Sequence, residues 1–84
     1  MTIFRDIVSS YNTGHLILIE EIRKRLFALN PSVNNHYYHK IYLLIAYCDY
    51  LLHPRIQTLQ HLADMIDTRR EIDRIILKQL NKVH

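Results

Sequence analysis

The sequence has little glycine, proline or cysteine: one glycine, two prolines and one cysteine among 84 residues. A single cysteine excludes an internal disulfide. The scarcity of glycine and proline, together with the lack of any long alternation of apolar and polar residues, favours helices over a β-sheet. Because Gly14 is the only glycine, a glycine-rich loop that binds phosphate groups is also excluded. We therefore expect an all-α fold.

The sequence also lacks the segments that mark membrane and exported proteins. Its longest uninterrupted apolar run, residues 41–48, is far shorter than the roughly 20 residues of a membrane-spanning helix. The N-terminus MTIFRDIVSS has neither the basic start nor the long apolar stretch of a signal peptide. These absences predict a cytoplasmic protein with no membrane partner.

Residue combinations that support catalysis or metal binding are incomplete. His36 and His39 are three residues apart and could share a helix face, but no cysteine or acidic residue at ligand spacing completes a tetrahedral set. Asp49 and His53 could pair as a general base and its orienting group, but no convincing nucleophile accompanies them. Cys48 falls on a predicted core face, where thiols are usually inert. We predict no enzymatic activity, no metal and no other cofactor.

The length and the apolar content together bear on partners. With 84 residues and no compositional break, the chain forms one small domain, residues 1–84. A domain of this size buries only about 60–65% of its unfolded surface. Since 49% of the residues are apolar, some apolar surface should be buried against a partner. A homodimer is the first expectation.

The net charge of +3 is concentrated at the C-terminal end. Residues 1–68 contain six basic and six acidic residues, whereas the last sixteen contain five basic and two acidic ones. Cations late in a helix offset its dipole by about 0.3–1 kcal/mol each, which accounts for Lys78 and Lys82. The dipole disfavours cations at the front of the segment, yet three arginines stand there: Arg69, Arg70 and Arg74. They form either a simple solvated face or a binding surface.

The first thirty residues are predicted to form two helices. A first helix over residues 3–11 is followed by turn residues 12–14, and apolar residues then recur at helical spacing over residues 16–29. Pro31 stops the second helix, since the residue before a proline is pushed away from helical angles. We expect residues 1–30 to supply a packing and dimerisation layer.

The third predicted helix, residues 36–52, is apolar or aromatic nearly all round. A helix of this kind is expected at the centre of its fold. Its outer tyrosines, Tyr42, Tyr47 and Tyr50, could stack on bases as in single-strand binders. Packing against the N-terminal helices or against a second subunit, where tyrosine is favoured, is the preferred interpretation.

Two more helices are predicted after Pro54. Thr58 can cap a helix that runs through Ile66, with Leu59 and Ile66 among its inward-facing residues. Thr68 is then followed three residues later by glutamate, the capping-box arrangement of a helix start. The sequence therefore predicts about five helices, with a break just before Thr68.

The last predicted helix, residues 69–82, separates an apolar side from a basic side. A short helix with exposed arginines at its N-terminal half fits the DNA major groove, where arginine pairs with guanine. Double-stranded DNA is therefore the expected partner. The candidate base or phosphate contacts are Arg69, Arg70 and Arg74; the candidate phosphate contacts are Lys78 and Lys82; the capping residues expected beside the DNA backbone are Thr58 and Thr68.

The run LADMIDTRREIDRIILKQL resembles the helix-turn-helix of bacterial transcription regulators of the Crp and MarR type. With the support helix upstream, the resemblance extends over roughly residues 36–82. It implies a tri-helical unit in which Leu62 and Ala63 belong to the first motif helix and Thr68 begins the recognition helix. It also implies transcriptional control through sequence-selective binding of double-stranded DNA, with paired recognition helices about 34 Å apart on a palindromic site.

The chain departs from this family pattern in three ways. Asp67 stands where the turn usually has glycine, and Asp73 stands where the recognition helix is usually apolar. After Leu80 too few residues remain for a β-hairpin wing. These departures keep a second function open: a small helical adaptor, chaperone or inhibitor that binds a protein instead of DNA.

Overall fold

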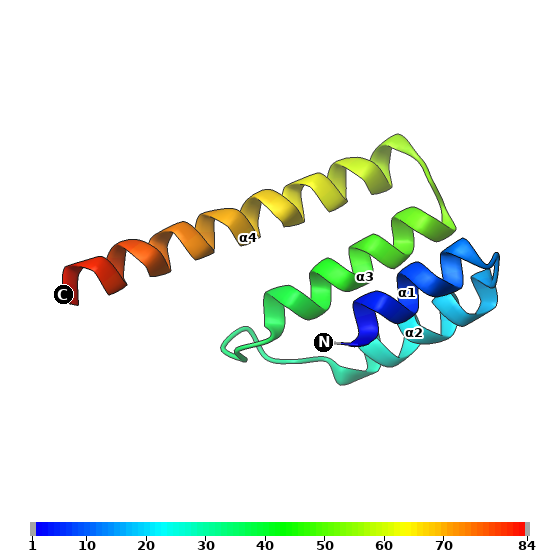
Figure 1. Cartoon of the computed structure of the whole chain (residues 1–84), viewed down its shortest axis with the longest axis horizontal. Helices are drawn as coiled ribbons and strands as arrows, with labels where there is room; N and C mark the ends of the chain where they lie inside the picture. The colour runs from blue at the N-terminus through cyan, green and yellow to red at the C-terminus, as the bar shows by residue number, and fades with distance from the viewer. Residues whose placement is uncertain (1, 84) are drawn as a thin grey trace.

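The computed structural model describes residues 2–83, in which the regular secondary structure is helical throughout. The all-α prediction is confirmed for this part of the chain, but the number of helices is four and not five. Figure 1 shows their arrangement. The helices are α1 (Thr2–Asn12), α2 (Leu16–Leu29), α3 (Tyr38–Leu52) and α4 (Ile56–Val83).

The two N-terminal helices end where the sequence predicts. Gly14 lies in the turn after α1 with a φ of 77°, a left-handed conformation that glycine adopts without a steric penalty. Asn30 caps α2 in the left-handed region, and its backbone N–H donates to the carbonyl of Phe27. Pro31 follows and prevents the helix from continuing. These local signals fix the αα-hairpin of α1 and α2.

Helix α3 is the central element, as its nearly continuous apolar surface predicts. It contacts α1, α2 and α4. It begins at Tyr38, two residues later than expected, because the side chain of Asn35 accepts the backbone N–H of Tyr37 in the preceding turn. Tyr47 packs on Phe4 of α1, with ring centroids 5.7 Å apart. The buried core is the cluster Ile7, Ile19, Leu26, Leu44, Ile45 and Cys48.

Helix α4 is the least covered element of the fold. Among the described helices it contacts α3 alone. Figure 1 shows its C-terminal end extending beyond the layer formed by α1, α2 and α3. Leu62 is its one buried apolar residue in the described part, and Met65 and Ile72 are half-buried. Most of the circumference of α4 therefore faces solvent.

The predicted break before Thr68 is wrong, because α4 is helical from Ile56 to Val83. The Thr68 hydroxyl donates to the carbonyl of Asp64, one turn earlier in the same helix, at 2.9 Å. Glu71 forms an ion pair with Arg74 instead of reaching back to cap. Residues 36–82 consequently contain two helices, and the expected tri-helical unit is not formed.

The helix continues through this region for identifiable reasons. No glycine or proline occurs between Ile56 and Val83 to interrupt it. The side that faces α3 also continues across the expected break, since Met65, Arg69 and Ile72 are half-buried at helical spacing. A threonine followed three residues later by glutamate marks the start of a helix only where the residues before the threonine are not helical.

Thr58 and Thr68 give opposite predictions for stability. Thr58 lies two residues inside α4, so it is not the N-cap residue that the sequence predicts. Its side-chain oxygen accepts the backbone N–H of Arg55 at 3.0 Å, so Thr58→Ala should cost about 0.5–1.5 kcal/mol through loss of this hydrogen bond. Thr68 is exposed within the helix, so Thr68→Ala should be neutral or stabilising by up to about 0.5 kcal/mol. Urea denaturation measures both. A cost of about 1 kcal/mol at Thr68 would restore the capping interpretation.

Candidate interaction surface on helix α4

All of the predicted DNA-contacting residues lie on α4, but they do not form one surface. Thr58 belongs to the first turn, where its hydroxyl donates to the carbonyl of His53 at 2.7 Å. Arg70, Arg74 and Lys78 are exposed. Arg69 is half-buried, and the side chain of Lys82 lies outside the part that the structure describes. The six residues whose side chains the structure describes therefore divide among different sides of one long helix.

Arg69 faces α3 of its own chain and not the solvent-exposed side of α4. It lines a cleft of about 270 Å³ between the start of α3 and the middle of α4. Within this cleft its guanidinium lies 3.4 Å from the carboxylate of Asp73, one turn along the helix. The other residues that line the cleft are His36, Tyr37, His39, Lys40, Ile72 and Ile76. Arg69 thus faces this cleft, pairs with Asp73 of its own helix and is less available to an external partner.

The exposed charges differ in whether they are neutralised. Arg74 forms an ion pair with Glu71 on the surface of α4. Asp67 and Arg70 are both exposed, and among the described residues neither has an ion-pair partner in its own chain. These two opposite charges are therefore free to meet groups on another molecule.

Charge is also distributed unevenly along α4. Residues 56–68 contain two aspartates and no lysine or arginine. Residues 69–79 contain four basic and two acidic residues, which gives this stretch a net charge of +2. The N-terminal half of the helix is acidic and the following part is basic.

Three large aliphatic side chains form an exposed line on α4, here termed the α4 stripe: Leu59, Ile66 and Leu77. Their exposed fractions are 48%, 38% and 60%. At about 100° per residue, all three lie within about 20° of one another around the helix axis. Ile75 is 48% exposed on nearly the opposite side. Apolar residues spaced along one side of an exposed helix can act as anchors in the groove of another protein.

The α4 stripe was missed by the sequence interpretation, which placed Leu59 and Ile66 in the core. Helical spacing predicts which residues share a side, but it does not say whether another element covers that side. The relevant signal was the high apolar content for so short a chain, which predicted apolar surface buried against a partner. The apolar content does not indicate which residues form that surface.

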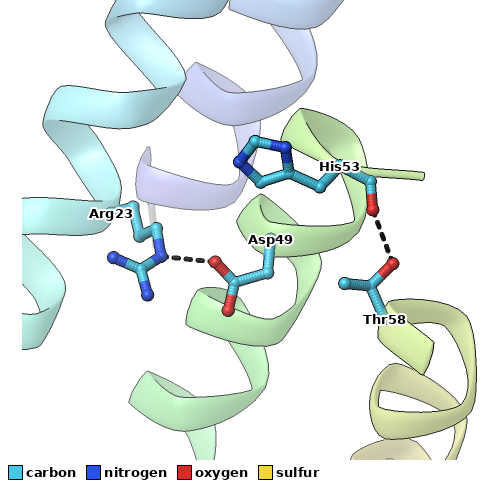
Figure 2. Close-up of polar contacts among 4 residues, drawn as sticks. All are labelled: Arg23, Asp49, His53 and Thr58. Carbon is cyan, nitrogen blue, oxygen red and sulfur yellow. Dashed lines mark hydrogen bonds and ion pairs between the residues drawn. The ribbon is translucent and has the colours of Figure 1, made fainter. Parts of the chain in front are cut away.

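The polar groups between α2, α3 and α4 have structural roles (Figure 2). Arg23 of α2 forms an ion pair with Asp49 of α3. The guanidinium carbon of Arg23 lies 5.8 Å from the centre of the Phe27 ring. His53 uses its backbone, since its N–H donates to the carbonyl of Asp49 at 2.8 Å. Asp49 is thus bound by Arg23, and the arrangement is not that of a base and its orienting group.

Other kinds of site have little support in the described part of the chain. Residues 2–83 contain no cluster of three or more histidine, cysteine, aspartate or glutamate side chains able to hold a metal ion. None of the described helices combines the length and the apolar character that a membrane crossing requires. Comparison with protein-family models, with curated proteins and with solved structures finds no match for this chain. The resemblance to helix-turn-helix regulators stays a prediction.

Proposed function

We propose that this chain is a protein-binding regulator, of the adaptor, chaperone or inhibitor class, that binds its partner through the α4 stripe. The observation that carries the proposal is that α4 contacts α3 alone and leaves three aligned aliphatic side chains exposed. A helix that lays its apolar side against a groove or another helix is a common mode of protein recognition. The continuous α4 supplies such a side over several turns.

The charges beside the stripe indicate the chemistry of the partner. Arg70 is exposed next to the stripe and has no ion-pair partner among the described residues of its own chain. An acidic group beside an apolar surface would pair with this guanidinium at the rim of the contact. The partner surface should therefore be apolar along its centre and acidic where it meets Arg70.

Site-specific photocrosslinking in cells of the source organism tests the proposal. A benzophenone amino acid at position 77 should give a discrete protein adduct, because this position lies on the stripe. The same amino acid at position 75 is the matched control, because Ile75 is also half-exposed but lies on the other side of α4. Equal adducts from both positions, or none from position 77, would contradict the proposal.

Double-stranded DNA is a second candidate partner, favoured by the exposed cations Arg70, Arg74 and Lys78. Without a turn in α4, the contact would be made by one continuous helix lying in a groove, as basic-region helices do. The ion pair between Arg74 and Glu71 weakens this candidate because it already neutralises one of the three cations. The exposed aliphatic stripe would also have no role in such a contact.

Fluorescence anisotropy of labelled duplex DNA at several salt concentrations measures this second activity. Weak non-specific DNA binders have dissociation constants of roughly 10⁻⁴ M at physiological salt. If α4 binds protein instead of DNA, we expect no saturable binding to random duplex below this protein concentration at about 0.15 M salt. DNA binding would instead appear as a steep salt dependence. Arg70→Ala/Lys78→Ala would then reduce the slope by about one for each of the two cations that binds a phosphate.

A further inference from the structure

We propose that the occupant of the α4 stripe is α4 of a second copy of this chain, paired antiparallel about a two-fold axis near Thr68. This inference rests on the proposed function, because it uses the same stripe and names the partner. A two-fold contact brings the same surface of both copies together, so it must be complementary to itself. Helix α4 meets this condition in its apolar residues and in its charges.

The apolar residues match about the two-fold axis. With the axis at residue 68, Leu59 of one copy lies opposite Leu77 of the second, and the reverse contact repeats at the other end. Ile66 lies near the middle of the line, beside the small exposed side chain of Ala63, which allows the helices to approach closely. At about 1.5 Å per residue, the segment from Leu59 to Leu77 is about 27 Å long.

The free charges match in the same register. Antiparallel pairing places Asp67 of one copy beside Arg70 of the second, and the two-fold axis creates this contact twice. Both side chains are exposed, and among the described residues neither is paired within its own chain. The aliphatic stem of Arg70 would cover Ile66 while its guanidinium reaches Asp67. Both of these free charges then have a counterpart on the second copy.

The charges also select the direction of pairing. A parallel pair in register would place Arg70 of one copy near Arg70 of the second, because Arg70 lies only about 20° from Leu59 around the helix. Like charges in contact are strongly unfavourable. The parallel pair would also bring the basic ends of both helices together, since residues 69–79 carry a net charge of +2. The antiparallel arrangement instead sets the acidic half of each helix against the basic part of the other.

Sedimentation equilibrium of charge-exchanged variants tests the inference. The wild-type chain should be dimeric. Asp67→Arg alone and Arg70→Asp alone should each raise the dimer dissociation constant about tenfold or more, because each places like charges in both contacts. An equimolar mixture of these two variants should form a heterodimer with near wild-type affinity. The double variant Asp67→Arg/Arg70→Asp should form a homodimer again.

Two further variants separate the stripe from general surface effects. Leu77→Asp should make the chain monomeric, whereas Ile75→Asp, on the other side of α4, should leave the dimer intact. Both sites are exposed, so both variants should fold, as circular dichroism would verify. A wild-type chain that is monomeric at all concentrations, or a mixture of the charge variants that fails to associate, would overturn the inference.

The result also separates this inference from the proposed function. If the wild-type chain is monomeric but photocrosslinks from position 77 to a different protein, the self-pairing is wrong and the protein-binding function stands. If the chain is monomeric and no specific adduct forms at position 77, both are wrong. A dimer that responds to charge exchange as expected supports the self-pairing and the part of the proposed function that makes the stripe a protein-binding surface.

Discussion

Replacing Ile19 by alanine is expected to lower the free energy of unfolding by about 2–5 kcal/mol, the range for truncating a buried isoleucine. Ile19 has no exposed surface and belongs to the core cluster with Ile7 and Cys48. Loss of its outer carbons leaves a cavity among three helices that the surrounding side chains fill only in part. A chain of 84 residues has a total stability of about 4–13 kcal/mol, so this loss is a large fraction of the total.

Ile17→Ala is the matched control for this prediction. Ile17 lies two residues earlier on the same helix and is 72% exposed, so the same truncation should change stability by no more than about 0.5 kcal/mol. Urea denaturation followed by circular dichroism measures both variants. Similar losses at the two positions would show that α2 does not pack with Ile19 toward α1 and α3.

The thiol of Cys48 is expected to react about 100-fold more slowly with iodoacetamide at pH 8 than the thiol of the unfolded chain, from its reduced thiolate fraction alone. Burial, together with the negative charge of Asp49, raises the pKa of Cys48 from 9.0 to about 11, while Arg23 acts in the opposite direction. The side chain also has no exposed surface, which should slow the reaction further. Reaction in native buffer and in urea gives the ratio.

The same pKa shift predicts a loss of stability at alkaline pH. In the unfolded chain the thiol ionises near its ordinary pKa of 9.0, but in the folded chain it stays neutral until about pH 11. Ionisation therefore favours the unfolded state increasingly as the pH rises from about 9 to about 11. The contribution is fully present below pH 9, and its loss amounts to on the order of 2–3 kcal/mol above pH 11.

Cys48→Ala isolates this contribution from the other groups that titrate at alkaline pH. The variant should be less stable than the wild type at neutral pH because it truncates a core residue. The tyrosines and lysines are the same in both proteins, so the difference in stability between them should narrow above pH 9. A constant difference from pH 7 to pH 11 would contradict the raised pKa of Cys48.

Local signals in the sequence predicted most of the fold. The Gly14 turn and the Asn30-Pro31 stop placed the ends of the first two helices close to their observed positions. The nearly continuous apolar surface of residues 36–52 predicted a central third helix, and α3 contacts all three other helices. These features depend on a few neighbouring residues, so a sequence pattern can express them.

The course of α4 could not be predicted in the same way. Thr68 and Glu71 form a start pattern, but a helix start also requires the preceding residues to leave helical geometry. Asp67 does not force the chain out of helical geometry, whereas a glycine at that position would have favoured a turn. Packing of Met65 and Ile72 near α3 keeps the helix continuous, and this tertiary contact is not visible in the local pattern.

The candidate site changed for the same reason. In a broken helix, the arginines after Thr68 would begin a separate recognition helix and face outward together. In the continuous helix, Arg69 instead lines the cleft between α3 and α4, Arg74 pairs with Glu71, and the α4 stripe is exposed. The dimerisation role expected for residues 1–30 stays a prediction, and the self-pairing of α4 is proposed in addition to it.

The continuity of α4 is the claim on which the interaction surface depends, and backbone NMR chemical shifts test it most directly. We expect helical Cα shifts at every residue from Asp64 to Ile72, with no interruption at Asp67 or Thr68. This result would place Leu59, Ile66 and Leu77 on one side of a single helix. Loss of helical shifts at Asp67 and Thr68 would contradict the account and restore two short helices joined by a turn.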